Sequence, residues 1–168
     1  SRADFLTING ESKSFEIKSE LDNLLKLSKQ IDDYQKVFDY NYVVIDEKHY
    51  RNALKLIPPH YGVMVLHGHK LTEDRQSQLN TRLNPLMQLK LFTKKELAQT
   101  FKIPGITVEE VLINFEDGEI NNWFKVMLKN RYSKRWSFLV DNKKKINPID
   151  YQFFFQHNIQ PELIYGVY

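Results

Sequence analysis

The chain has 168 residues, of which 24 are basic and 21 acidic. Its net charge is only +3, which does not by itself indicate a nucleic-acid-binding protein. It contains no cysteine, which excludes disulfides, thiolate metal sites and thiol nucleophiles and fits a reducing compartment. No apolar run approaches the ~20 residues that span a bilayer and no signal peptide is visible, so we expect a cytoplasmic protein without a membrane partner.

Two strands joined by a tight turn are predicted at the start of the chain. Residues 3–8 alternate between two faces, as the side chains of a half-buried strand do. Asn9-Gly10 is a strong hairpin signal, and the alternation resumes over residues 14–18. We therefore expect an antiparallel hairpin.

This hairpin would bring three charged residues together. A loop of residues 9–11 would set Asp4 directly opposite Glu16, with Cβ atoms ~5 Å apart, and Lys18 would share the face of Glu16. Two facing carboxylates repel each other unless a cation lies between them, so the pair is a candidate metal site. The alternative is a salt-bridge cluster on a solvated hairpin face.

A helix and two buried strands are predicted next. Ser19 can cap a helix with Asp22 in its first turn, and apolar residues then recur at helical spacing to about Phe38. The β-prone runs 42–45 and 61–66 are typical of strands buried on both faces, and residues 47–56 between them predict a helix. Strand, helix and strand in this order favour parallel pairing, so we expect a mixed sheet.

The second half of the chain is mostly helical in its pattern. Residues 71–80 are polar and predicted as a loop, which suggests an α/β core over 1–70 and a helical extension over 71–168. Helices are predicted at 85–91, 94–101, 108–115, 119–132 and 148–157.

An acidic residue stands two positions before a lysine at Glu11, Glu16, Asp46 and Asp141. Only Glu16 lies in an alternating apolar run, has an aspartate one hairpin earlier and is followed by a predicted helix that carries a Gln-x-x-x-Tyr motif. The set Asp4, Glu16-Ile17-Lys18 and Gln30 with Tyr34 resembles the PD-(D/E)XK nuclease superfamily, in particular its RecB-type members.

The resemblance implies a restriction-endonuclease-like fold: an α/β core with a mixed sheet flanked by helices, here followed by the helical extension. Family members place a helix before the strand of the aspartate, and here that aspartate is the fourth residue, so we expect the N-terminal helix of the core to be missing. It also implies Mg²⁺ or Mn²⁺ held by Asp4, Glu16 and the main-chain carbonyl of Ile17.

By the same resemblance, Lys18 orients the attacking water and stabilises the developing charge, while Gln30 and Tyr34, one helical turn apart, help to assemble the site. The alternative for this last pair is an ordinary amphipathic helix with Tyr34 in the core. The expected function is a magnesium-dependent deoxyribonuclease, a phosphodiester hydrolase, and duplex cleavage would require two sites and hence a homodimer.

Two other function classes stay open. One is a non-catalytic nucleic-acid-binding module with this fold, and the other is a protein-interaction domain that docks a partner through the aromatic-rich residues 151–155 with Tyr165 and Tyr168. Basic and aromatic residues interleave over 123–145, either as a phosphate-tracking surface or as the solvated face of a core helix.

Two weaker patterns are interpreted conservatively. Residues 93–115 resemble a helix-turn-helix, but Glu109 and Glu110 on the second helix would oppose DNA phosphates, which favours ordinary helix packing. His67 and His69 would share one face of an extended segment, yet no third ligand is evident, so a pair at a strand end explains them better than a metal site.

Overall fold

The computed structural model describes residues 3–145. The chain divides into two compact units, Ser1–Lys125 and Val126–Tyr168.

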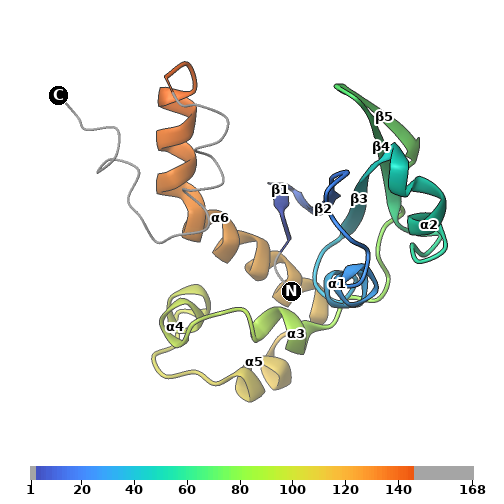
Figure 1. Cartoon of the computed structure of the whole chain (residues 1–168). Helices are drawn as coiled ribbons and strands as arrows, with labels where there is room; N and C mark the ends of the chain where they lie inside the picture. The colour runs from blue at the N-terminus through green and yellow to red at the C-terminus, as the bar shows by residue number, and fades with distance from the viewer. Residues whose placement is uncertain (1–2, 146–168) are drawn as a thin grey trace. The chain divides into compact units, whose positions relative to one another are not determined.

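The first unit contains a mixed five-stranded sheet, with its strands in chain order (Figure 1). Strand β2 is antiparallel to β1, the strands β2, β3 and β4 run parallel, and β5 is antiparallel to β4. The mixed sheet and its antiparallel opening hairpin are therefore confirmed. The strands are β1 (Phe5–Asn9), β2 (Glu11–Lys18), β3 (Tyr40–Asp46), β4 (Gly62–His67) and β5 (Lys70–Arg75).

The register of the first hairpin is the predicted one. Ile8 pairs with Ser12 and Phe5 with Phe15, so the residue before β1, Asp4, faces Glu16. Gly10 turns the chain at φ +76°, in the left-handed region where a residue without a Cβ is favoured. The strand itself begins at Phe5 and not at residue 3.

Helices α1 (Leu27–Tyr34) and α2 (Tyr50–Leu54), the latter preceded by a 3₁₀ turn η1 (Glu47–His49), contribute to one core with the sheet. Side chains alternate along β3 and β4: Val43, Ile45, Val63 and Val65 are buried in this core, whereas Tyr42, Val44, Met64 and Leu66 on the other face are half-buried. The prediction that these strands are buried on both faces is therefore wrong for the second face. Burying each such aliphatic side chain contributes about 1.5–3 kcal/mol. The core residues are Leu27, Ile31, Val43, Ile45, Ala53, Ile57, Tyr61, Val63 and Val65.

The helix predicted from residue 19 to residue 38 is shorter than expected. It begins at Leu27 and ends at Tyr34. The Asp22 carboxylate accepts hydrogen bonds from the backbone N–H and the hydroxyl of Ser19, which closes a local turn and not a helix. Leu21 and Leu25 are 92% and 88% exposed, so no apolar burial compensates the entropy cost of extending the helix through them.

A strand was missed between residues 70 and 75. Gly68, at φ +58°, closes a hairpin that returns the chain as β5 along the edge of the sheet. Most of its residues are exposed, so β5 lacks the apolar alternation from which strands are recognised. Strand β5 begins at residue 70, and the predicted boundary between core and extension at that residue stays a prediction.

The rest of the described chain is helical, in agreement with the predicted helical extension. Thr93 and Glu96 form a capping box at the start of α4, and Thr107 and Glu110 form another at the start of α5. The helices are α3 (Pro85–Leu89), α4 (Lys94–Phe101), α5 (Val108–Asn114) and α6 (Asp117–Asn142). Helix α6 is longer than the predicted 119–132, and the helix predicted at 148–157 lies outside the described residues.

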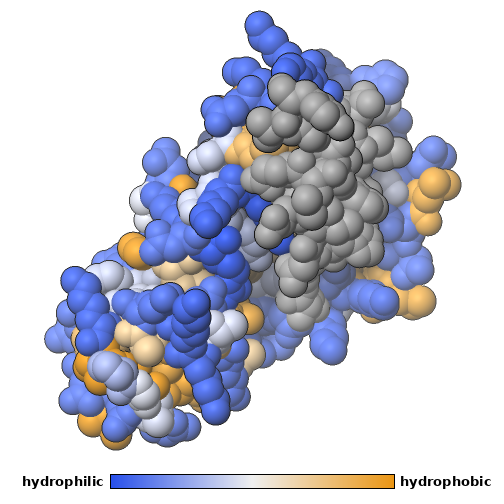
Figure 2. Space-filling model, turned by 90° about the vertical axis from the view of Figure 1, so that its left-hand side faces the viewer, coloured by the Kyte–Doolittle hydropathy of each residue, from blue (hydrophilic) through white to orange (hydrophobic). Residues whose placement is uncertain are grey.

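Within residues 94–115 the two helices pack as ordinary core helices. Their buried side chains join α3 and the start of α6 in one cluster made of Leu89, Leu97, Phe101, Ile106, Val111 and Ile120. In one view of the surface, hydrophilic residues predominate and the hydrophobic ones gather in small separate patches (Figure 2). Among the described helices, none combines the length and the apolar character that crossing a membrane requires.

Candidate active site

Four polar residues of strand β2 lie on the buried side of the sheet. Ser12, Ser14, Glu16 and Lys18 alternate onto that side, and Glu16 is only 2% exposed. A buried carboxylate is costly unless it is paired and hydrogen-bonded. The contacts of Glu16 therefore define the candidate site.

Both oxygens of the Glu16 carboxylate accept hydrogen bonds from predicted site residues. The ammonium of Lys18 donates to Oε1 at 2.7 Å, and the side-chain amide of Gln30 donates to the same oxygen. The hydroxyl of Tyr34 donates to Oε2 at 2.8 Å. The sequence motif thus corresponds to one physical cluster that joins β2 to α1.

Helix α1 holds Gln30 and Tyr34 in place because its other face is core. Leu27 and Ile31 are buried against the sheet, and the hydroxyl of Tyr61 donates to the carbonyl of Ile31 at 2.7 Å. Since residues four apart on a helix project together, fixing that face also fixes the two polar side chains over Glu16.

Asp4 lies beside this cluster but has a different partner. One oxygen of its carboxylate accepts the backbone N–H of Ile17 at 2.9 Å, and the residue is exposed. Its charge acts on Glu16, as expected for carboxylates that face each other across a hairpin. All five predicted site residues are thus brought into one region.

The surroundings of Glu16 make its carboxylate easier to protonate than a carboxylate in water. Burial raises the pKa of Glu16 above its usual 4.5; hydrogen bonds from Lys18 and Tyr34 oppose this rise, and the negative charge of Asp4 adds to it. Burial and the neighbouring Glu16 also raise the pKa of Tyr34, which keeps its hydroxyl a hydrogen-bond donor.

We expect Glu16 to titrate above pH 4.5 in the folded protein. Because the folded state then binds the proton more tightly than the unfolded state, the free energy of unfolding contributed by this group falls as pH rises from 4.5 through the folded pKa. A titration followed by the ¹³C chemical shifts of the side-chain carboxyls measures the pKa of Glu16 directly. Glu110 is the internal control, because the backbone and hydroxyl hydrogen bonds of Thr107 lower its pKa. A Glu16 midpoint at or below 4.5 contradicts the expectation.

The cluster contains oxygen atoms of the kind that hard divalent cations bind. Asp4 and Glu16 offer carboxylate oxygens, and Oε1 of Gln30 is buried with no hydrogen-bond partner among the described groups. The described chain holds no group of three or more His, Asp or Glu side chains suited to a metal. Mg²⁺ commonly uses one or two carboxylates with waters and substrate phosphates, so magnesium binding by Asp4 and Glu16 stays a prediction. The carbonyl of Ile17 as a ligand stays a prediction.

Other predicted candidates do not join this site. Nδ1 of His67 lies 2.7 Å from Oε2 of Glu47, and the pair is exposed at the end of β4. This agrees with the strand-end interpretation of the two histidines.

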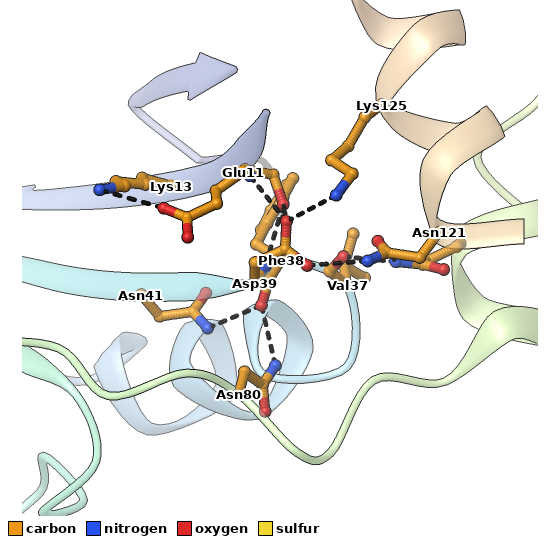
Figure 3. Close-up of polar contacts among 11 residues, drawn as sticks. Glu11, Lys13, Val37, Phe38, Asp39, Asn41, Asn80, Asn121 and Lys125 are labelled. Atoms are coloured by element: carbon orange, nitrogen blue, oxygen red, sulfur yellow. Dashed lines mark hydrogen bonds and ion pairs between the residues drawn. The ribbon is translucent and has the colours of Figure 1, made fainter. Parts of the chain in front are cut away.

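A second polar cluster, centred on Asp39, was not anticipated from the sequence (Figure 3). Its carboxylate accepts the backbone N–H and the hydroxyl of Ser12 at 2.7 and 2.9 Å, the amide of Asn121 at 2.8 Å and the ammonium of Lys125 at 3.3 Å. Asp39 is 4% exposed. The cluster ties β2, which carries Glu16, to the start of α6.

A family assignment follows from comparison with known sequences. The pattern of the family described as bacteriophage P4 protein cII matches residues 1–154. The chain belongs to the bacteriophage P4 protein cII family. Protein cII of Enterobacteria phage P4 is 25% identical to it over 144 residues, covering 78% of this chain and 54% of that relative. The chain therefore spans about half the length of this curated cII protein.

A comparison with solved structures returns SPO1766, a protein of unknown function from Silicibacter pomeroyi. Its TM-score is 0.41 at 13% identity, with 83% of this chain and 68% of that chain covered. Neither this name nor that of the cII family states a chemical activity.

Proposed function

We propose that the chain is a metal-dependent phosphodiester hydrolase acting on DNA, built on a restriction-endonuclease-like core of the PD-(D/E)XK type. The observation that carries the proposal is the convergence of Lys18, Gln30 and Tyr34 on the buried carboxylate of Glu16. These residues come from two segments that the sequence motif had already linked. An opening hairpin that leads into parallel strands is the sheet expected for this superfamily.

Each side chain has a physical task in such a reaction. Tyr34 and Gln30 fix the Glu16 carboxylate in one orientation, and Asp4 supplies the second carboxylate from across the hairpin. Lys18, a cation beside two acids, stabilises negative charge on the phosphate and orients the water without acting as the base. A bound Mg²⁺ or Mn²⁺ would neutralise phosphate charge and lower the pKa of a coordinated water.

One observation favours a second candidate, a non-catalytic nucleic-acid-binding module. The two oxygens of Glu16 already accept three side-chain hydrogen bonds, a set that satisfies the carboxylate without any metal. A cluster of this kind could be retained for stability alone.

A metal titration with end-labelled DNA separates the two candidates. We expect products to appear with Mg²⁺ or Mn²⁺ and to be absent with EDTA, on single-stranded or duplex DNA. A labelled RNA of the same sequence tests the choice of DNA. Binding that weakens with salt, without cleavage under any metal, would assign the chain to the non-catalytic class.

A further inference from the structure

The positive charge of the chain is concentrated in one segment. Residues 126–145 carry seven basic side chains and one acidic side chain. Residues 1–125 carry 17 basic and 18 acidic side chains. Residues 146–168 carry no basic side chain and two acidic side chains. The net charge of +3 therefore conceals a local charge of +6 over 20 residues.

The lysines of this segment are available to a partner. Five of them are exposed, and none forms a salt bridge with another residue of the described range 3–145. Trp136, within the same segment, is 62% exposed. The five lysines are Lys129, Lys134, Lys143, Lys144 and Lys145.

Their spacing suits an extended chain of anions. From Lys129 to Lys143 the chain advances by about 21 Å at 1.5 Å per helical residue, so charges at both ends of the segment can meet several phosphates. Duplex DNA carries about one negative charge per 1.7 Å of axis. An exposed tryptophan between the lysines adds a surface on which an unpaired base can stack.

Two ordinary explanations account for part of this pattern. Lysines at a helix C-terminus are stabilised by the helix dipole. This explains the presence of the three lysines at 143–145 but not that of Lys129 or Lys134. A membrane-surface helix needs its cations on one face and its apolar residues on the other. Lys134 lies about 140° around the helix from Lys129, so the cations do not share the single face that a membrane-surface helix needs. The major groove of duplex DNA admits an α-helix, so phosphates can approach such a helix from more than one side.

We propose that residues 126–145 form a binding surface for the phosphate backbone of nucleic acid, without base specificity. The proposal concerns binding alone and holds whether or not the Glu16 site is catalytic. It assigns nucleic-acid binding to the second compact unit, whereas the Glu16 cluster belongs entirely to the first.

The test is binding of the whole chain to a fluorescein-labelled duplex of about 20 bp, longer than the segment, measured by anisotropy in EDTA over a series of salt concentrations. The variant changes the five lysines to glutamine. We expect its affinity to fall more than tenfold and the slope of log K against log salt to decrease by about 0.9 for each phosphate that the variant no longer neutralises.

A matched control changes five exposed lysines of the first unit to glutamine: Lys55, Lys90, Lys94, Lys95 and Lys102. It removes the same charge and should leave the salt slope near that of the unaltered chain. Equal losses in both variants, or no loss in the first, would overturn the proposal, as would binding to vesicles rich in phosphatidylserine with no binding to the duplex. Binding is measured without metal, so the binding proposal and the proposed nuclease function are tested independently. A failed cleavage assay does not contradict the binding proposal, and cleavage activity does not support it if the lysine variant binds as tightly as the unaltered chain.

Discussion

Lys18→Met is expected to reduce metal-dependent cleavage of DNA by about 10²- to 10³-fold or more, the range found when a preorganised electrostatic group is removed from an active site. Methionine keeps the length of the side chain and removes its charge. Lys18 is the charged donor of the cluster, because Gln30 and Tyr34 are neutral, so its ammonium is the group that would stabilise charge on a phosphate. The measurement is the single-turnover rate at saturating Mg²⁺.

Lys13→Met is the matched control for this variant. Lys13 lies on the same strand, but its side chain projects to the opposite side and sits 5.1 Å from the centre of the Tyr40 ring. Its removal should change the cleavage rate by less than about tenfold. If Lys18→Met cleaves at the unaltered rate, or if both variants lose the same activity, the assignment of Lys18 is wrong.

Loss of folding must be distinguished from loss of chemistry. Removing one member of a buried ion pair costs about 3–5 kcal/mol, because the other charge stays buried without its partner. The double variant Glu16→Gln with Lys18→Met removes both charges and should regain much of this stability while remaining inactive. Urea unfolding followed by circular dichroism gives the free energies.

The sequence predicted best the features that depend on neighbouring residues. Asn9-Gly10 sets the turn, and the turn sets which residue faces Glu16, so the position of Asp4 followed from a local pattern. Gln30 and Tyr34 came from the resemblance to the nuclease motif, and helical spacing predicted correctly that they project together, even though the predicted helix was too long. In that helix the apolar period continued through Leu21 and Leu25, which have no core to contact.

The Asp39 cluster was missed because it depends on distant contacts. Asp39 gathers donors from Ser12, 27 residues earlier, and from Asn121 and Lys125, 82 and 86 residues later, and no local pattern links them. One signal was present: Ser12 and Ser14 occupy inward positions of β2, where an apolar side chain is expected. Polar residues at such positions require buried partners, and the partners proved to be Asp39 and Asn41.

Asp39→Ala is expected to lower the free energy of unfolding by about 3–5 kcal/mol near neutral pH, as much as the loss of one member of the Glu16–Lys18 pair. The substitution leaves the backbone N–H of Ser12 and the largely buried ammonium of Lys125 without their acceptor. Asp32→Ala is the control, because Asp32 is an exposed carboxylate paired with Lys36 and should cost less than about 1 kcal/mol. Equal costs for the two variants would contradict a structural role for the Asp39 cluster.

The dependence of this difference on pH identifies the carboxylate as its cause. Burial alone would raise the pKa of Asp39, but hydrogen bonds from Ser12 and Asn121 and the charge of Lys125 outweigh it, so the pKa lies below the usual 3.8. A lowered folded pKa means that the stabilisation is fully present above 3.8 and is lost as pH falls through the folded value. The stability difference between the unaltered chain and Asp39→Ala should therefore stay constant from neutral pH down to about pH 5 and shrink below about pH 4. A difference that remains constant throughout acidification would show that packing around the side chain, and not its charge, stabilises this part of the fold.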